Sequence, residues 1–408
     1  MNKKEVAEIK RRFKKESCTI DRMVGCYVDS NKDMVLTFND TFIDLEEEEY
    51  YKYMEIISKC FSGTLGNNLL ELPFDINAEI EGGGQDLLFK LRESRLTDEK
   101  QLLEYYQRII DSYDYPGNYF IVMFHDTYDI PMKTNDNLLL DDSDEVYDYV
   151  VGAICPVELS KPALGYRPEE NRIGSRTRDW VVKPVDTGFI YPCFTERSTD
   201  LHACMAYTKN ANDPHTEFWE NCLGCGSKRT SSQKKAAFAN IIKKSIGEEG
   251  EDCEDTVLDI QQNLSDFIAL ESERLGEDES IILQPGDVKD ILTDSGVSEG
   301  KVNRITESYE QYFEGELPEA EELLDSRALK SNELRLEKIE LKERVVDLTK
   351  QLEEVGAIAK DGRAANVVVK VDDERLTTVE TTFVNGVKCL VIPLEPDDYT
   401  VINGEHIE

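Results

Sequence analysis

The most informative absences in this 408-residue sequence are long apolar runs and recognisable export signals. The longest uninterrupted apolar run, Tyr119 to Phe124, is far shorter than the ~20 residues that a membrane-spanning helix needs. The stretch from Asn2 to Glu16 is charged, and no apolar segment follows it, so we expect no signal peptide. The sequence therefore predicts a soluble, cytoplasmic protein without a membrane partner.

Catalytic signatures are also scarce. The chain has only four histidines, which is few for acid–base chemistry. It contains no Walker A loop, no GxGxxG after a strand, no GxSxG elbow and no HExxH helix. An enzyme of unknown class remains one alternative, with its site near His125, Arg176, Arg178 or His202. The sequence favours a protein that is not an enzyme and that needs no cofactor.

The ten cysteines are too sparse for a secreted disulfide scaffold, so we expect reduced thiols. Cys222-Leu-Gly-Cys225 has the spacing of a pair of metal ligands or of a redox pair. His202 and Cys204 lie upstream and would complete a four-ligand zinc site. Ordinary buried thiols are the simpler interpretation, because a single CxxC is a weak signal and the spacing from Cys204 matches no standard zinc finger.

The fold class predicted is α+β, and residues 1–225 form its mixed, antiparallel, β-rich part. A helix is expected over Asn2–Glu16, docked on its own domain through an apolar stripe of Val6, Ile9 and Phe13. The runs Thr19–Val28 and Met34–Phe42 predict a β-hairpin, because a polar turn separates them.

Two further strands are predicted in the centre of this first part. The runs Asn118–Phe124 and Val146–Pro156 are apolar and aromatic, as buried strands are. An acidic loop, Asn135–Glu145, separates them, so we expect them to pair antiparallel.

Residues 226–315 are expected to form a helical region. Apolar residues recur every three or four positions in Ser231–Ile246 and Thr256–Leu275. A helix–turn–helix unit is expected around Gly296, with Ser298 as the N-cap of its second helix. The surrounding stretch, 285–314, carries a net charge of −4, which argues against a DNA-reading role because such modules are normally basic.

A long helix and a small β module are expected to follow. Residues 316–360 carry an imperfect heptad pattern in which Leu334, Leu341, Leu348 and Val355 recur every seven residues. Residues 361–408 contain a strong hairpin signal, Asn385-Gly386, between two apolar runs. A short coiled coil and self-association are therefore possible uses of the helix.

Four strings resemble an uncharacterised bacterial domain-of-unknown-function family, found mainly in anaerobic gram-positive bacteria. They are "MNKKEVAEIKRRFKKESCTIDRMVGCYV", "GTLGNNLLEL", "GFIYPCFTERSTDLHACMAYTKN" and "DSGVSEGKV". The resemblance extends over most of the chain. It implies a cytosolic protein and brings no catalytic residue, because the family has no established activity.

Positive charge is scarce overall but clustered. The chain has 47 Lys and Arg against 84 Asp and Glu, a net charge of −37, yet segments 1–16, 160–183 and 227–245 carry +4, +3 and +6. Such clusters can bind a polyanion while the acidic remainder repels it. The simpler interpretation is that each cluster is a solvated surface whose cations pair with nearby acids, such as Glu248 and Glu249 after the third segment. The predicted polyanion-binding residues are Arg167, Arg172, Arg176, Arg178, Lys228, Arg229, Lys234, Lys235, Lys243 and Lys244.

Three functional hypotheses follow. The first is a non-enzymatic binding or adaptor protein, with a protein partner or a second copy of the chain as its partner. The second is a nucleic-acid or ribonucleoprotein-associated protein that uses the three basic islands. The third is the enzyme of unknown class, and the sequence ranks it last.

Overall fold

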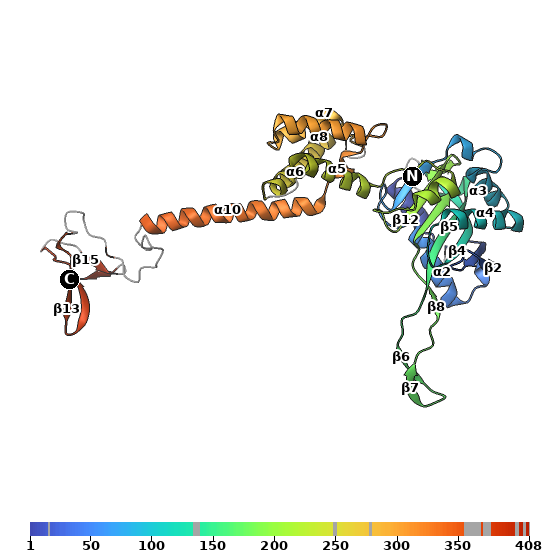
Figure 1. The fold of residues 1–408 in the computed structure, drawn as a ribbon, viewed down its shortest axis with the longest axis horizontal. Coiled ribbons are helices and arrows are strands. Elements are labelled where there is room, and N and C mark those ends of the chain that lie inside the picture. Colours follow the sequence, from blue (N-terminus) through green and yellow to red (C-terminus); the bar gives the residue numbers. More distant parts are fainter. Residues whose placement is uncertain are drawn as a thin grey trace. The chain divides into compact units, whose positions relative to one another are not determined.

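The computed structural model describes residues 1–14, 17–133, 139–247, 251–276, 280–354, 369, 377–395, 400–402 and 405–407. Internal contacts divide the chain into two units, Met1–Leu329 and Lys330–Glu408 (Figure 1). The first unit holds an eight-stranded sheet and a helical region, and the second holds most of a long helix and two small hairpins. The predicted α+β class is confirmed.

The sheet is antiparallel throughout, with the order β2-β1-β4-β5-β9-β12-β3 and with β8 paired to β5. Its strands are β1 (Arg22–Val28), β2 (Met34–Thr41), β3 (Leu69–Pro73), β4 (Asn118–Lys133), β5 (Leu139–Leu159), β8 (Trp180–Val182), β9 (Thr187–Tyr191) and β12 (Ala203–Thr208). The predicted hairpin of β1 and β2 is confirmed.

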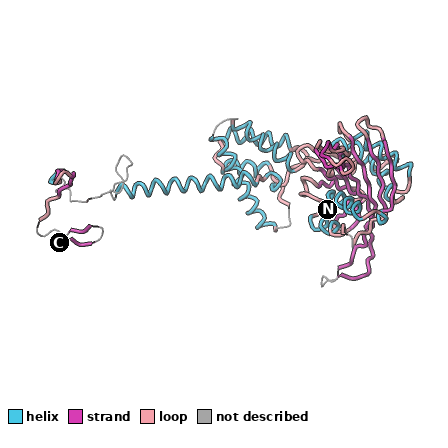
Figure 2. Tube along the Cα trace, turned by 90° about the horizontal axis from the view of Figure 1, so that it is seen from below, coloured by secondary structure: helices cyan, strands magenta, loops and turns pink. Residues whose placement is uncertain are grey.

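Helices cover both faces of this sheet (Figure 2). On β4, Ile121 and Met123 face one core, while Val122 and Phe124 face the other, as the two-residue period of a strand requires. The first core is closed by α3 (Gly84–Glu93), α4 (Glu99–Ser112) and the π-helix η3 (Phe218–Leu223). The second is closed by α1 (Lys3–Lys10) and α2 (Glu47–Cys60). Short 3-10 turns, η1 (Phe42–Asp44) and η2 (Ile76–Ala78), and a two-stranded ribbon of β10 (Cys193–Thr195) and β11 (Ser198–Asp200) complete this part.

Two predictions for this region need adjustment. The pairing of the two central strands is confirmed, but the loop between them is shorter than expected, because β4 continues to Lys133 and β5 begins at Leu139. The N-terminal helix docks on its own domain, with Ile9 and Phe13 buried, but it ends at Lys10 rather than Glu16. Residues 134–138, 15 and 16 lie outside the described part of the chain.

The helical region follows the predicted periodicity closely. It contains α5 (Ser231–Ile246), α6 (Glu251–Leu275), α7 (Pro285–Asp294), α8 (Glu299–Tyr312) and α9 (Ala320–Leu323), packed around one apolar core. The turn between α7 and α8 needs the positive φ of +74° at Gly296, and Ser298 is the N-cap of α8 as expected.

The long helix is α10 (Ser326–Glu354), separate from α9. Beyond it, β13 (Glu380–Val384) and β14 (Val387–Val391) form the predicted hairpin, in which Asn385 and Gly386 both have positive φ. A second pair is formed by β15 (Thr400–Ile402) and β16 (Glu405–Ile407). Val355 of the heptad pattern lies outside the described residues. Within the described part of the chain, no helix is long and apolar enough to cross a bilayer.

Candidate functional site

Four of the predicted polyanion-binding arginines lie on a projecting β-ribbon, residues 157–182, which we call the arm (Figure 1). Its base pairs the end of β5 with β8, so that Leu159 lies opposite Trp180. Its tip pairs β6 (Leu164–Arg167) with β7 (Arg172–Ser175), so that Leu164 lies opposite Ser175. This pairing continues the register of the base. The arm is exposed, and Trp180 keeps 55% of its surface in solvent.

The arm arginines already have partners. Arg167 lies 3.0 Å from Glu170, which Arg172 also contacts, and Arg176 lies 3.9 Å from Asp179. Arg178 donates from Nε to the carbonyl oxygen of Ser160 at 2.8 Å. Exposed ion pairs of this kind contribute only about 0–1 kcal/mol, so a ligand can compete with them.

The six cations of the third island lie on α5 or just before it, and they have different roles. Lys234 is 8% exposed and forms ion pairs with Glu322 at 2.8 Å and Glu316 at 3.5 Å, so it links α5 to α9 and to the segment before it. Arg229 donates to the carbonyl oxygen of Tyr312 at 2.7 Å and lies over its ring. The other cations are Lys228, Lys235, Lys243 and Lys244. None of the hydrogen bonds or ion pairs of the described residues joins this island to the arm.

The structure brings Cys204 and Cys225 of the predicted zinc site into contact, but His202 faces solvent away from the cysteines. His202 is exposed and bonds through Nδ1 to Glu79 at 2.8 Å, while Cys204, Cys222 and Cys225 are buried in the core of the sheet domain. Burial raises the pKa of Cys222 to about 12 and raises the pKa of Cys204 well above its ordinary value. Protonated thiols are poor ligands and poor nucleophiles. Over the described ranges, no group of three or more His, Cys, Asp or Glu is placed to hold a metal ion.

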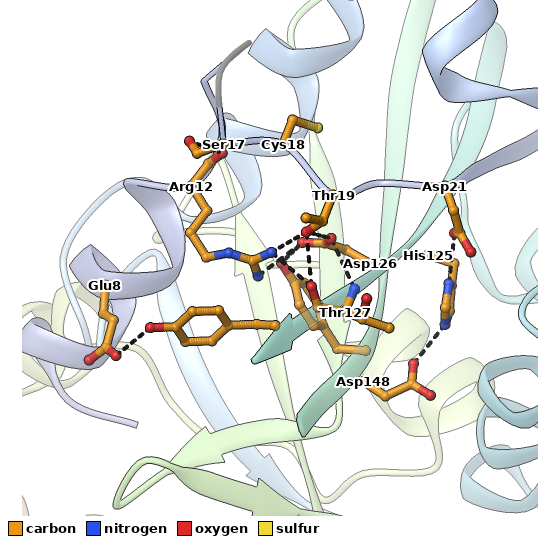
Figure 3. A network of polar contacts seen from close by, with 12 residues as sticks. Glu8, Arg12, Ser17, Cys18, Thr19, Asp21, His125, Asp126, Thr127 and Asp148 are labelled. Carbon is orange, nitrogen blue, oxygen red and sulfur yellow. Dashed lines mark hydrogen bonds and ion pairs between the residues drawn. The ribbon is translucent and has the colours of Figure 1, made fainter. Parts of the chain in front are cut away.

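His125 lies between two carboxylates at the exit of the buried part of β4 (Figure 3). Its Nδ1 is 2.8 Å from Asp21 Oδ1, its Nε2 is 2.6 Å from Asp148 Oδ1, and its side chain is fully buried. Both partners are carboxylates, so both ring nitrogens donate when the imidazole is protonated and positively charged. In that form neither nitrogen keeps a lone pair with which to act as a general base.

The charge on His125 makes stability depend on pH. Burial alone lowers the pKa of His125, but the hydrogen bonds to Asp148 and Asp21 outweigh it and raise the pKa above 6.5. A raised folded-state pKa gives a stabilisation that is fully present below the unfolded-state pKa and disappears as pH rises through the folded-state pKa. His125→Gln should therefore lower the free energy of unfolding more at about pH 5.5 than at about pH 9.5. Urea titration of both proteins measures this, and a pH-independent difference would contradict it.

Asp126, the next residue, anchors the segment after α1 to the sheet (Figure 3). It accepts hydrogen bonds from Thr19 Oγ1 at 2.6 Å, from the backbone N–H of Thr127 at 2.9 Å and from the hydroxyl of Tyr149. The guanidinium of Arg12 lies 3.2 Å from Asp126 Oδ2, the oxygen that also accepts from Tyr149, whereas Thr19 and Thr127 bond Oδ1. His125 and Asp126 both lie within β4, beyond the predicted strand Asn118–Phe124, and their partners are too far away along the chain to be found from spacing.

A third polar cluster, formed by Asp186, His215 and Tyr113, was not predicted from the sequence. His215 Nε2 and the Tyr113 hydroxyl both lie 2.8 Å from Asp186 Oδ2. Burial raises the pKa of Asp186, but hydrogen bonds from His215 and Tyr113 prevail and lower it. The carboxylate is thus held in its charged form with its ring neighbours bound to it. Through this one carboxylate the cluster joins three separate stretches of the chain.

Comparison with known proteins identifies the family of the chain but no activity. No curated protein and no solved structure matches it. One family, described as Domain of unknown function (DUF4317), matches residues 1–405. Since this match covers nearly the whole sequence and agrees with the resemblance noted from the four strings, the protein belongs to the DUF4317 family.

Proposed function

We propose that the chain is a non-enzymatic, cytoplasmic binding protein, an adaptor that assembles through α10. The observation that carries this proposal is the surface of α10. Over residues 326–351 of this 29-residue helix, where side-chain exposure is described, seven aliphatic side chains are exposed: Leu334, Leu336, Ile339, Leu341, Val345, Val346 and Leu348. A helix in contact with water alone carries polar residues all round, so this surface supports a role in contacting other chains.

The exposed residues form two stripes. Leu334, Leu341 and Leu348 recur every seven residues, with Val345 beside them, which is the pattern of a coiled-coil seam. Ser331 and Lys338 occupy the matching positions earlier in the helix and limit the length of the seam. Leu334 and Leu341 are 66% and 63% exposed.

The second stripe consists of Leu336, Ile339 and Val346. At 3.6 residues per turn it lies roughly 160° around the helix from the first stripe. A helix with apolar stripes on nearly opposite sides can contact two partners at once. This supports an adaptor role over a simple pairing of two chains.

The polar clusters support a non-enzymatic role in a different way. His125 uses both ring nitrogens on carboxylates, and His215 has its Nε2 on Asp186. A general base needs a free lone pair within reach of a substrate proton. Neither cluster offers a nucleophile beside such a base.

The test is the size of the nuclease-treated protein in solution. Leu341→Gln combined with Leu348→Gln keeps helix propensity but removes two apolar contacts per chain from the seam. If the helices pair, the dissociation constant should rise at least roughly 100-fold, because each lost leucine contributes about 1.5–3 kcal/mol. Sedimentation velocity over a concentration series measures the change.

The matched control combines Glu333→Gln with Glu340→Gln, which has the same seven-residue spacing on a polar face. This pair should leave the assembly unchanged. A wild-type protein that stays monomeric and co-purifies with no partner after nuclease treatment would defeat the proposal.

The second candidate function is association with nucleic acid or ribonucleoprotein. One observation favours it: basic residues are concentrated on the arm and on α5 in an otherwise acidic chain. Loss of every partner on nuclease treatment would favour this candidate over the adaptor.

A further inference from the structure

The two basic surfaces differ in how many of their cations form ion pairs with acidic residues of the described chain. On the arm, Arg167, Arg172 and Arg176 each pair with an acid. Around α5, the ion pairs of the described residues neutralise Lys234 alone. The other cations at this second place have no acidic partner among the described residues, so an anion can bind there without displacing one of the ion pairs given above.

One face of α5 borders a cavity of about 490 Å³. The helix contributes Gln233, Ala236, Asn240 and Lys244, whose spacing of three or four residues puts them on the same side. Arg229 and Tyr312 line it from outside the helix. None of the described residues that line the cavity is acidic, although the chain as a whole carries a net charge of −37.

The polar groups that line the cavity suit an anion that also offers hydrogen-bond acceptors. Arg229 is held in place by its hydrogen bond to the Tyr312 carbonyl and by the ring beneath it, 4.3 Å away. Gln233 uses its oxygen on the Thr230 N–H, which leaves its NH₂ group as a donor. The first backbone N–H groups of α5 are already bonded to Gly66 and Asn67, so the side chains make the site.

The length of this surface distinguishes a strand from a small ligand. Lys244 lies roughly 20 Å along α5 from its first residue, Ser231, and Arg229 lies just before that end of the helix. The small side chains of Ala236 and Ala237 lie between them and leave the middle of the surface open to close approach. An extended polyanion can contact both cations at once, and a single nucleotide cannot.

We propose that this surface, the α5 groove, binds the phosphodiester backbone of a single nucleic-acid strand, with Arg229 and Lys244 on separate phosphates. Lys243, exposed and adjacent to Lys244, adds a third cation at the rim. The Gln233 and Asn240 amides bind phosphate or sugar oxygens between them. This inference rests on the nucleic-acid candidate and is independent of assembly through α10.

The test is the salt dependence of binding to a labelled oligouridine, measured by filter binding on nuclease-treated full-length protein. Three cations on a single strand predict a slope of about −2 for log K against log salt. Lys243→Gln combined with Lys244→Gln should reduce the slope to about −0.7. Both side chains are exposed, so unchanged circular dichroism should show an intact fold.

Three comparisons complete the experiment. Arg172→Gln combined with Arg176→Gln on the arm should leave the slope unchanged. Uridine monophosphate should not compete at concentrations where the oligouridine saturates, and polyglutamate should bind far more weakly. An unchanged slope in the α5 variant, a reduced slope in the arm variant, or equal binding of either competitor would overturn the proposal. Assembly through α10 is tested by sedimentation velocity and strand binding by the α5 groove is tested by filter binding, so either proposal can be rejected without the other.

Discussion

Asp126→Ala should lower the free energy of unfolding by about 3–5 kcal/mol, the largest effect of any polar substitution we expect. Asp126 is 2% exposed and accepts hydrogen bonds from Thr19, Thr127 and Tyr149 while it neutralises Arg12. Its removal leaves a guanidinium that is only 12% exposed without its counter-charge. Urea unfolding followed by circular dichroism measures the loss.

The control for this variant is Asp129→Ala. Asp129 lies three residues along the same strand and is exposed, so its removal should change stability by less than about 0.5 kcal/mol. If Asp126→Ala were as mild as this control, the network around Arg12 would have no energetic role.

Lys234→Met should destabilise the protein by about 2–3 kcal/mol, while Lys243→Met should have almost no effect. The two lysines lie on the same helix, but Lys234 is buried against Glu322 and Lys243 is exposed. Without Lys234, Glu322 keeps its charge at 15% exposure and has only hydrogen-bond donors left, from Ser231 and from the backbone of Glu319. We expect a smaller loss of stability than the roughly 3–5 kcal/mol typical of a broken buried ion pair, because the Glu322 carboxylate remains partly exposed to water.

A double variant gives the sharper test of this ion pair. Lys234→Met combined with Glu322→Gln removes the uncompensated charge, while the amide oxygen can still accept from the Glu319 N–H and the amide NH₂ group can donate to the Ser231 hydroxyl. It should therefore recover part of the stability lost by Lys234→Met alone. A double variant less stable than Lys234→Met would mean that the charge is not what destabilises the single variant.

Periodicity predicted most of the local structure. The bounds of α5 match the expected helix Ser231–Ile246, and the hairpin at Asn385-Gly386 has the positive φ values that its sequence requires. These elements depend on spacing within a few residues, which a sequence displays directly. Short strands such as β3 and β12 were not anticipated, because runs of only five or six residues are too short to show a distinctive period.

The polar sites were much less predictable. Counting charges located the basic island on α5, but the count could not separate Lys234 from its neighbours. Its partner Glu322 lies 88 residues away along the chain. In the same way, His125 meets Asp21 across 104 residues. Such pairs come from tertiary packing, and a single sequence contains no local trace of them.

The contrast between the two tryptophans gives the molecule two separate optical reporters. Trp219 is fully buried in η3, beneath the sheet, and Trp180 is 55% exposed on the arm. The chain contains no other tryptophan. Their fluorescence should therefore combine a blue-shifted emission from the core with a red-shifted, quencher-accessible emission from the arm. Trp180→Phe should isolate the first, so that unfolding of the core and contacts made by the arm can be followed in the same protein at different wavelengths.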